Sequence, residues 1–160
     1  MIRALAICVV LAGCSVTNQV PIGAAASSGA PLPAGAIAGI PTRQNPKCFV
    51  TRIVDGDTIA IRCGAVEENA RLMGFDTPET FRSGCAAEKD KGLQAKRYLE
   101  TVLRAASVIS PDYNGRDKYR RALVELTIDG IPLSRKMVDA RMAVPYSGGK
   151  RINWCNRLVR

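Results

Sequence analysis

The stretch that decides the fold is FVTRIVDGDTIAIR, residues 49–62. Two runs rich in β-branched residues flank Asp55-Gly56, and Asp-Gly between such runs is a strong β-hairpin signal. If Asp55-Gly56 is a two-residue turn, residues whose numbers sum to 111 lie opposite each other. Cys48 and Cys63 form such a pair, so the hairpin predicts a disulfide between its two strands.

Beyond the hairpin, the hydrophobic pattern alternates between strand and helix periods. The remaining expected elements are strands over 69–74, 107–110 and 122–128, and helices over 86–106, 132–141 and, as a final turn, 151–160. Five short strands with helices between and after them predict an α+β domain built on a small closed sheet, such as a five-stranded Greek-key β-barrel.

The N-terminus carries an export signal. Met1-Ile2-Arg3 precedes an apolar run that is too short to span a bilayer and that ends in Leu11-Ala12-Gly13-Cys14. This end resembles the lipobox of bacterial lipoproteins, which implies a signal peptide over 1–13 and a lipid on Cys14. The alternatives are an ordinary secretory signal, with a secreted product, and an unprocessed membrane anchor. Ser15, where Asp would indicate inner-membrane retention, favours the outer membrane or the cell surface.

The segment that follows has the composition of a linker. Residues 14–47 are rich in Ala, Gly, Pro and Ser and contain no acidic residue. Such a segment cannot bury enough apolar surface to offset its ordering entropy. We expect a flexible tether over 14–47 and a folded domain over 48–160.

Four cysteines fall in the predicted domain, and an even number in an exported domain indicates a disulfide framework. They are Cys48, Cys63, Cys85 and Cys155, which allow three pairings. The hairpin register selects Cys48–Cys63, and Cys85–Cys155 then follows by elimination. Four buried free thiols are the alternative.

Composition limits the chemistry. The chain has no histidine, so the commonest general acid-base residue and zinc ligand is excluded. Residues 48–160 hold all 14 acidic residues and 20 of the 23 basic ones, a net charge of +6. This charge favours an anionic partner such as nucleic acid or lipid headgroups.

Two acidic clusters lie about twenty residues apart, at 55–58 and 76–79. Taken alone, the first is a hairpin turn and the second a helix cap. Together they place Asp57, Asp76 and Glu79 at turns near arginines. Carboxylates so placed repel one another unless a cation neutralises them.

Three motifs occur in order and at compatible spacing: Asp-Gly-Asp-Thr at 55–58, Arg-x4-Asp-Thr-Pro-Glu at 71–79 and Asp-Lys-Tyr-x-Arg at 117–121. With these motifs the sequence resembles the staphylococcal-nuclease-like (thermonuclease) family over residues 49–146. The resemblance implies an OB-type five-stranded Greek-key β-barrel with two to three helices. It also implies a Ca²⁺-dependent nuclease of low sequence specificity that acts on DNA and RNA as a monomer without an obligate protein partner.

The resemblance also implies a metal site. The carboxylates of Asp57 and Asp76 and the backbone carbonyl of Thr77 match the family's Ca²⁺ ligands. Calcium prefers several oxygen ligands and needs no nitrogen or sulfur donor.

Three further residues match catalytic positions of the family. Glu79 matches the general base, or the residue that positions the water, and Arg71 and Arg121 match the arginines that bind the phosphate. Guanidinium forks can engage two phosphoryl oxygens as negative charge grows. The alternative for Arg71 is a plain ion pair with one of the aspartates, and for Arg121 an exposed basic residue.

Two positions relate less closely to the family pattern. Arg120 replaces the glycine that the family usually has before its second arginine, so the turn could shift or Arg120 could share the phosphate contact. Tyr146 lies near a family tyrosine that stacks on the nucleotide, and packing at the barrel edge is its alternative. Trp154 is expected to pack in the core.

These expectations combine into a lipid-anchored nuclease of the bacterial cell envelope. Because OB-type domains often bind single strands without cutting them, the main alternative is a non-catalytic nucleic-acid-binding module. A third hypothesis, an envelope lipoprotein whose basic surface binds anionic polymer or lipid, leaves the carboxylates and arginines unexplained.

Overall fold

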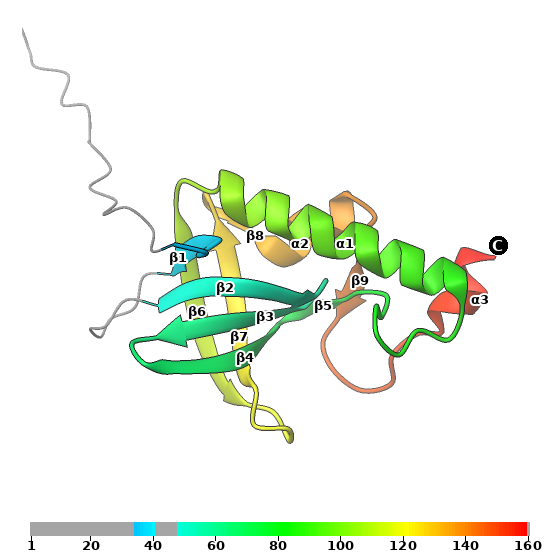
Figure 1. Cartoon of the computed structure of the whole chain (residues 1–160). Helices are drawn as coiled ribbons and strands as arrows, with labels where there is room; N and C mark the ends of the chain where they lie inside the picture. Colours follow the sequence, from blue (N-terminus) through cyan, green and yellow to red (C-terminus); the bar gives the residue numbers. More distant parts are fainter. Residues whose placement is uncertain (1–33, 41–47, 160) are drawn as a thin grey trace, which may run out of the picture.

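The computed structural model describes residues 34–40 and 48–159 (Figure 1). The predicted signal peptide and Cys14 lie outside the described residues. Within the described part, no helix is both long enough and apolar enough to cross a membrane.

A curled mixed sheet forms the body of the domain. Its first three long strands, β2 (Cys48–Asp55), β3 (Thr58–Cys63) and β4 (Val66–Leu72), pair antiparallel in chain order. β7 (Ala122–Ile128) pairs parallel with β4, and β6 (Ile109–Arg116) pairs antiparallel with β7. The five strands in this order, with a helix between the third and the fourth, confirm the predicted α+β class and OB-type barrel.

A short strand outside the predicted domain extends this sheet. β1 (Ala38–Ile40) pairs antiparallel with β2 and contacts β6, which lies at the opposite end of the sheet. Ile37 and Ala38 are buried. The prediction that all of 14–47 is a linker is therefore wrong for this segment, because its apolar residues cover the open edge of β2.

The first hairpin differs by one residue from its prediction. Gly56 and Asp57 form the turn, with Asp55 opposite Thr58. Two register shifts in β2 then bring Cys48 opposite Cys63, as predicted. Bulges of this kind bend a strand and increase its twist, so they also contribute to the curl of the sheet.

Three helices complete the fold of residues 34–40 and 48–159. They are α1 (Ala86–Ala105), α2 (Leu133–Asp139) and α3 (Trp154–Leu158), within two residues of the predicted starts for the first two. Figure 1 shows α1 running across one face of the sheet, with α3 near its beginning. The buried face of α1 is a stripe at helical spacing: Glu88, Gly92, Ala95, Leu99 and Leu103. Leu99 and Leu103 join the core that the sheet lines with residues such as Ile59, Leu72 and Val124.

Short strand pairings and one of two disulfides hold the C-terminal part in place. β5 (Gly74–Asp76) pairs with β9 (Val144–Tyr146), and β8 (Ile131–Pro132) pairs with β7. The disulfides join Cys48 to Cys63 and Cys85 to Cys155, as the sequence predicts. The second bridge connects the start of α1 to α3.

Candidate active site

The first acidic cluster directs a carboxylate into the domain rather than into solvent. Asp57 is 3% exposed. Its carboxylate accepts hydrogen bonds from the Thr58 hydroxyl at 3.0 Å and from the Thr77 N–H at 3.3 Å. The Leu72 N–H donates to the Asp57 backbone carbonyl at 2.8 Å. Acidic side chains are rarely buried unless they are paired, so Asp57 has more than a turn-forming role.

Close packing explains the glycine of this turn. A Cβ at Gly56 would lie 2.8 Å from Thr77 Oγ1 and 2.9 Å from the Ala95 side chain. Any larger residue would push the turn away from Thr77 and α1. Gly56 therefore allows the two acidic clusters to approach each other.

The second acidic cluster begins at Asp76, the last residue of β5. Asp76 and Thr77 are each 1% exposed, and the Trp154 indole N–H donates to Asp76 Oδ2 at 3.0 Å. Trp154 is buried as predicted, and it also orients this carboxylate. A Cβ at Gly92 of α1 would lie 2.7 Å from the Pro78 carbonyl oxygen and 2.9 Å from that of Glu79. The helix backbone therefore packs directly on this segment.

Arg71 of β4 connects the two clusters. Its guanidinium forms an ion pair with Asp57, and Nη2 lies 3.4 Å from Asp76 Oδ1 and donates to the Phe75 carbonyl at 3.3 Å. The side chain is 14% exposed and lines the pocket described below. Arg71 thus forms the ion pairs with the aspartates that were expected as the alternative to a catalytic role. It also lines the pocket, as a phosphate-binding residue would.

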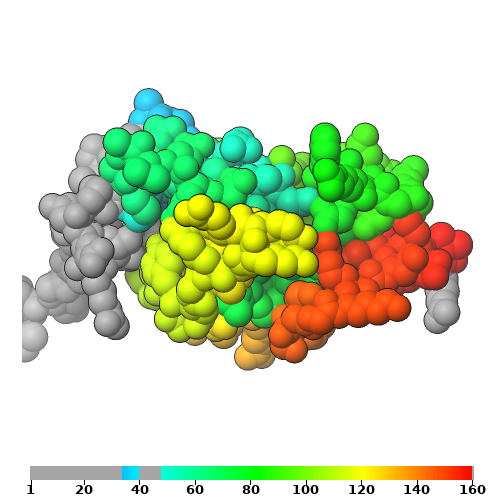
Figure 2. Space-filling view, turned by 90° about the horizontal axis from the view of Figure 1, so that it is seen from below, coloured from blue at the N-terminus to red at the C-terminus, as the bar shows by residue number. Residues whose placement is uncertain are grey.

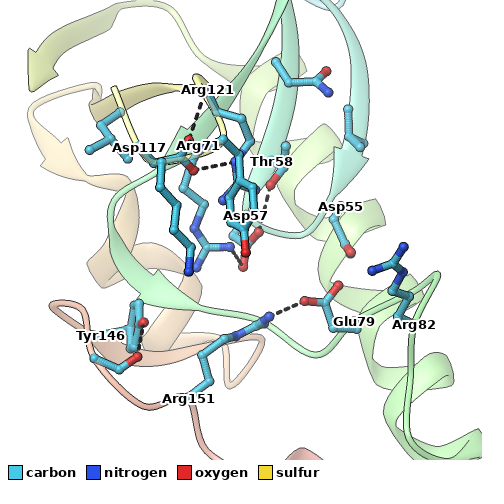
Figure 3. A pocket seen from close by; sticks show the side chains of 16 residues that line it. Asp55, Asp57, Thr58, Arg71, Glu79, Arg82, Asp117, Arg121, Tyr146 and Arg151 are labelled. Carbon is cyan, nitrogen blue, oxygen red and sulfur yellow. Dashed lines mark hydrogen bonds and ion pairs between the residues drawn. The ribbon is translucent and has the colours of Figure 1, made fainter. Parts of the chain in front are cut away.

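Arg151 is the residue that sequence reasoning missed. Its guanidinium pairs with Glu79 (Figure 3) and with Asp76, and Nη2 donates to the Thr77 carbonyl at 2.9 Å. The predicted Cys85–Cys155 disulfide was the available signal for its position. A segment that is linked to Cys85 must lie close to the residues that precede α1.

Glu79 lies at the rim of the site, with its side chain 34% exposed. Its burial favours the neutral acid, but the hydrogen bond and charge of Arg151, together with a hydrogen bond from Asp55 and the charge of Arg71, lower the pKa of Glu79 below its usual value. Glu79 is therefore an anion at neutral pH.

Asp55 behaves in the opposite way. Burial, together with the charges of Asp57 and Glu79, raises the pKa of Asp55 to about 6. Hydrogen bonds from the N–H groups of Gly56 at 2.9 Å and Thr80 at 3.3 Å oppose the shift without cancelling it. The neighbouring carboxylates Asp55 and Glu79 are thus pushed toward different protonation states, which is a frequent feature of active sites.

The third motif supplies a second arginine from the β6–β7 connection. Arg121 Nε lies 2.7 Å from Asp117 Oδ2, and its backbone N–H donates to Asp117 Oδ1 at 2.9 Å. The guanidinium carbon lies 5.6 Å from the centroid of the Tyr119 ring, and Lys118 Nζ lies 5.1 Å from it. These contacts place two cations against an exposed aromatic ring.

Arg120 keeps the turn geometry that a glycine would favour. Its φ is 66°, in the left-handed region that L-residues other than Gly, Asn and Asp rarely adopt. Its N–H donates to the Asp117 carbonyl at 2.9 Å. The side chain is exposed and is not among the residues that line the pocket, so its contact with substrate stays a prediction.

Tyr146 belongs to β9 and is half-buried. Its hydroxyl donates to the Gly149 carbonyl at 2.7 Å, and the residue lines the pocket. The geometry fits both the stacking role and the packing role that the sequence left open.

These side chains share one pocket of about 740 Å³. Figure 2 shows this face of the molecule, with the yellow β6–β7 connection beside the orange and red C-terminal segment and green residues recessed between them. The acidic and basic residues converge in Figure 3. Of the predicted residues, Asp57, Arg71, Glu79, Arg121 and Tyr146 line the pocket, and Asp76 and Thr77 lie directly behind it through Arg71 and Arg151.

The donors at this site suit a hard cation. Two carboxylates, Asp57 and Asp76, share the cationic Arg71, and the Thr77 carbonyl points at a second guanidinium. All three are oxygen donors of the kind that Ca²⁺ prefers. Arg71 bridges Asp57 and Asp76, and Arg151 bridges Asp76 and Glu79. Among the Cys, Asp and Glu side chains of the described residues, the one group of three whose ligand atoms all lie within 4.8 Å of one another is Cys85, Glu88 and Cys155. Its two cysteines are joined in a disulfide, so this group is not a competing metal site.

Comparison with known proteins connects this geometry to one family. Residues 69–153 match the sequence model of a family described as staphylococcal nuclease homologue. This span contains every predicted catalytic, metal-binding and substrate-binding residue of the domain except Asp57, and it includes Arg151.

Three curated proteins are similar to the chain. It is 26% identical over 107 residues to a thermonuclease of Staphylococcus hyicus, covering 66% of this chain and 63% of that protein. It is 36% identical over 76 residues to a thermonuclease of Staphylococcus intermedius, covering 47% and 45%. It is 30% identical over 117 residues to endonuclease YncB of Bacillus subtilis, covering 68% and 56%. The chain thus spans about half the length of these relatives.

Proposed function

Since the chain belongs to the staphylococcal nuclease homologue family, we propose that it is a nuclease that hydrolyses phosphodiester bonds of DNA and RNA. The relatives named thermonuclease and endonuclease support this reaction. The observation that carries the proposal is the convergence of Asp57, Arg71, Glu79 and Arg121 on one pocket.

A Ca²⁺ ion held by Asp57, Asp76 and the Thr77 carbonyl is part of the proposal. When bound, it supplies positive charge that polarises the phosphate group. Two observations support this ion. All three groups offer oxygen atoms, and positively charged guanidinium groups already contact the Asp76 carboxylate and the Thr77 carbonyl.

Glu79 is the proposed general base. Its lowered pKa keeps it ionised at neutral pH, so it can accept a proton from the attacking water. A carboxylate of low pKa is a weak base, and positioning of the water is therefore an important part of its role.

The two arginines bind the scissile phosphate. Arg121 is held by Asp117 beside the Tyr119 ring, and Arg71 is fixed by both aspartates. Guanidinium groups that are already oriented need no rearrangement as charge develops on the phosphoryl oxygens. The exposed Tyr119 ring provides a surface for a base without reading its edges. Phosphate and stacking contacts carry little sequence information, so we propose low sequence specificity.

We also propose that the domain acts at the bacterial cell envelope, anchored through Cys14 and as a monomer. The sequence Leu11-Ala12-Gly13-Cys14 and two disulfides, which persist in oxidising compartments, support this location. Incorporation of radiolabelled palmitate into the wild-type chain, and its loss in Cys14→Ser, tests the anchor.

One assay separates the enzyme from the non-catalytic binding module. The full chain, Glu79→Gln and the control Glu125→Gln, an exposed carboxylate of β7, are incubated with plasmid DNA in Ca²⁺ or in EGTA. We expect Ca²⁺-dependent degradation by the wild type and the control, and a loss of about 10²–10⁴-fold in Glu79→Gln. Binding of DNA without cleavage by the wild type would reject the enzyme in favour of the binding module.

A further inference from the structure

Arg151 binds the same groups that are proposed to hold the metal. Its guanidinium pairs with Asp76 and Glu79 and donates to the Thr77 carbonyl. It therefore contacts two of the three proposed metal ligands and the proposed general base at once. An arginine so placed provides positive charge at the position where the acidic cluster attracts a cation.

The segment that carries Arg151 is fixed at one end and adaptable at the other. On the C-terminal side, Trp154 is buried and Cys155 is bonded to Cys85. On the N-terminal side, Gly148 and Gly149 are exposed and adopt φ values of 108° and 87°. Glycines tolerate such angles and their alternatives equally well, so this side of the segment can change conformation.

The charges of the cluster explain why a second guanidinium is needed. Asp57 and Asp76 are both buried, and Glu79 lies beside Asp76 because both carboxylates contact Arg151. Arg71 pairs with the two aspartates at 57 and 76. Within the described residues, Glu79 has Arg151 as its ion-pair partner.

We propose that Arg151 is a built-in competitor of the metal ion. It neutralises Asp76 and Glu79 and hydrogen-bonds the Thr77 carbonyl when metal is scarce, and it gives up these groups when metal binds, which frees Glu79 to contact water. This inference rests on the proposed metal site, but its consequences are measured by binding and stability without any cleavage reaction. A failure of nuclease activity and a failure of this inference are therefore distinguishable.

The test is a Ca²⁺ titration of the full chain, without nucleic acid, by isothermal calorimetry and by the fluorescence of Trp154. Trp154 is the only tryptophan of the chain, and its indole N–H donates a hydrogen bond to Asp76. Its fluorescence emission therefore reports directly on the proposed metal site. The variants are Arg151→Gln and a matched control, Arg157→Gln, which removes the same charge from an exposed position of α3.

Competition predicts opposite effects on affinity and on stability. Arg151→Gln should bind Ca²⁺ about tenfold more tightly or better, because a positive charge a few ångströms from the ion is removed. Its Tm should fall below that of the wild type in EGTA, and the difference should close or reverse in saturating Ca²⁺. Arg157→Gln should behave as the wild type.

Other outcomes overturn the inference. Weaker or unchanged Ca²⁺ binding by Arg151→Gln, with a Tm deficit that persists in Ca²⁺, would make Arg151 a structural residue. An absence of Ca²⁺ binding by both proteins would reject both this inference and the Ca²⁺ proposal. If Arg151→Gln does not fold, Arg151→Lys replaces it: a lysine keeps the charge but not the planar fork, so competition predicts an intermediate gain in affinity and a structural role predicts a loss.

Discussion

The substitution Gly92→Ala tests whether α1 sets the position of residues 76–79, the segment that carries the proposed general base. Gly92 lies inside a helix, where alanine normally stabilises by about 1 kcal/mol. Here a Cβ would lie 2.7 Å from the Pro78 carbonyl oxygen and 2.9 Å from that of Glu79. Both oxygens belong to the backbone, so the contact is relieved only if the helix or the segment moves.

The size of the movement follows from the geometry. Ordinary contact begins at 3.4 Å, so the Pro78 carbonyl must retreat by about 0.7 Å. Overpacking of this kind costs about 1–3 kcal/mol, which the gain in helix propensity partly offsets. We therefore expect a net loss of stability of about 0–2 kcal/mol. Because a misplacement of about 1 Å at a reacting group can cost about 10²-fold in rate, we expect kcat/KM to fall by about 10- to 100-fold.

The assay compares cleavage of a fluorogenic oligonucleotide with urea unfolding for the wild type, Gly92→Ala and Gln94→Ala. Gln94 is exposed on the same helix, so its substitution reports on helix propensity alone. A Gly92→Ala protein that is about 1 kcal/mol more stable and retains activity within twofold would refute the reasoning, because the helix would then tolerate a Cβ without moving Glu79.

Three further predictions concern the surroundings of the site. Because the pKa of Asp55 is raised to about 6, its contribution to stability is present below about pH 4 and is lost as pH rises through 6. In EGTA, Asp55→Asn should therefore raise Tm at pH 7 and have little effect at pH 4; an equal gain at both pH values would contradict this. Arg120 has a left-handed backbone conformation, so Arg120→Gly should raise the free energy of unfolding in urea by about 0.5–1 kcal/mol. We expect its kcat/KM to stay within threefold of the wild type. A large loss of activity would instead support a contact between Arg120 and the substrate. Removing the 70-residue Cys85–Cys155 link by a double Ser substitution should cost about 4 kcal/mol in the chain-entropy account, measured as a lower urea midpoint; an unchanged midpoint would show that the bridge does not constrain the unfolded chain.

Sequence patterns predicted the parts of this protein that depend on local chemistry. The Asp-Gly turn, the 3.6-residue period of α1 and the β-branched strands are local signals, and each element is found within a few residues of its prediction. The pairing of Cys48 with Cys63 was also correct, although the turn lies one residue later than expected. Bulges leave no clear mark in the sequence, so the two register shifts within β2 were not predicted. They offset the different position of the turn, and the predicted register therefore holds at the cysteines but not at the turn.

The parts that sequence patterns did not predict depend on tertiary contacts. β5 and β9 are each three residues long, too short to show an alternating period, and their pairing is what brings the C-terminal segment to the site. The outer half of β6 is polar and contains glycine, so only its pairing with β7 keeps it extended. Arg151 belongs to no motif, and its position depends on β9, Trp154 and the Cys85–Cys155 bridge together.

The segment from Asp76 to Glu79 is held from two sides, and this determines which part of the site can respond to a metal. On one side, α1 packs against it so closely that Gly92 has no room for a side chain. On the other side, Arg151 holds it by charge. Packing between backbones in a dense core resists small displacements, whereas an ion pair on a glycine-containing segment can exchange one partner for another. The acidic segment therefore keeps its position, and the segment that carries Arg151 is the one that moves when a competing cation enters the site.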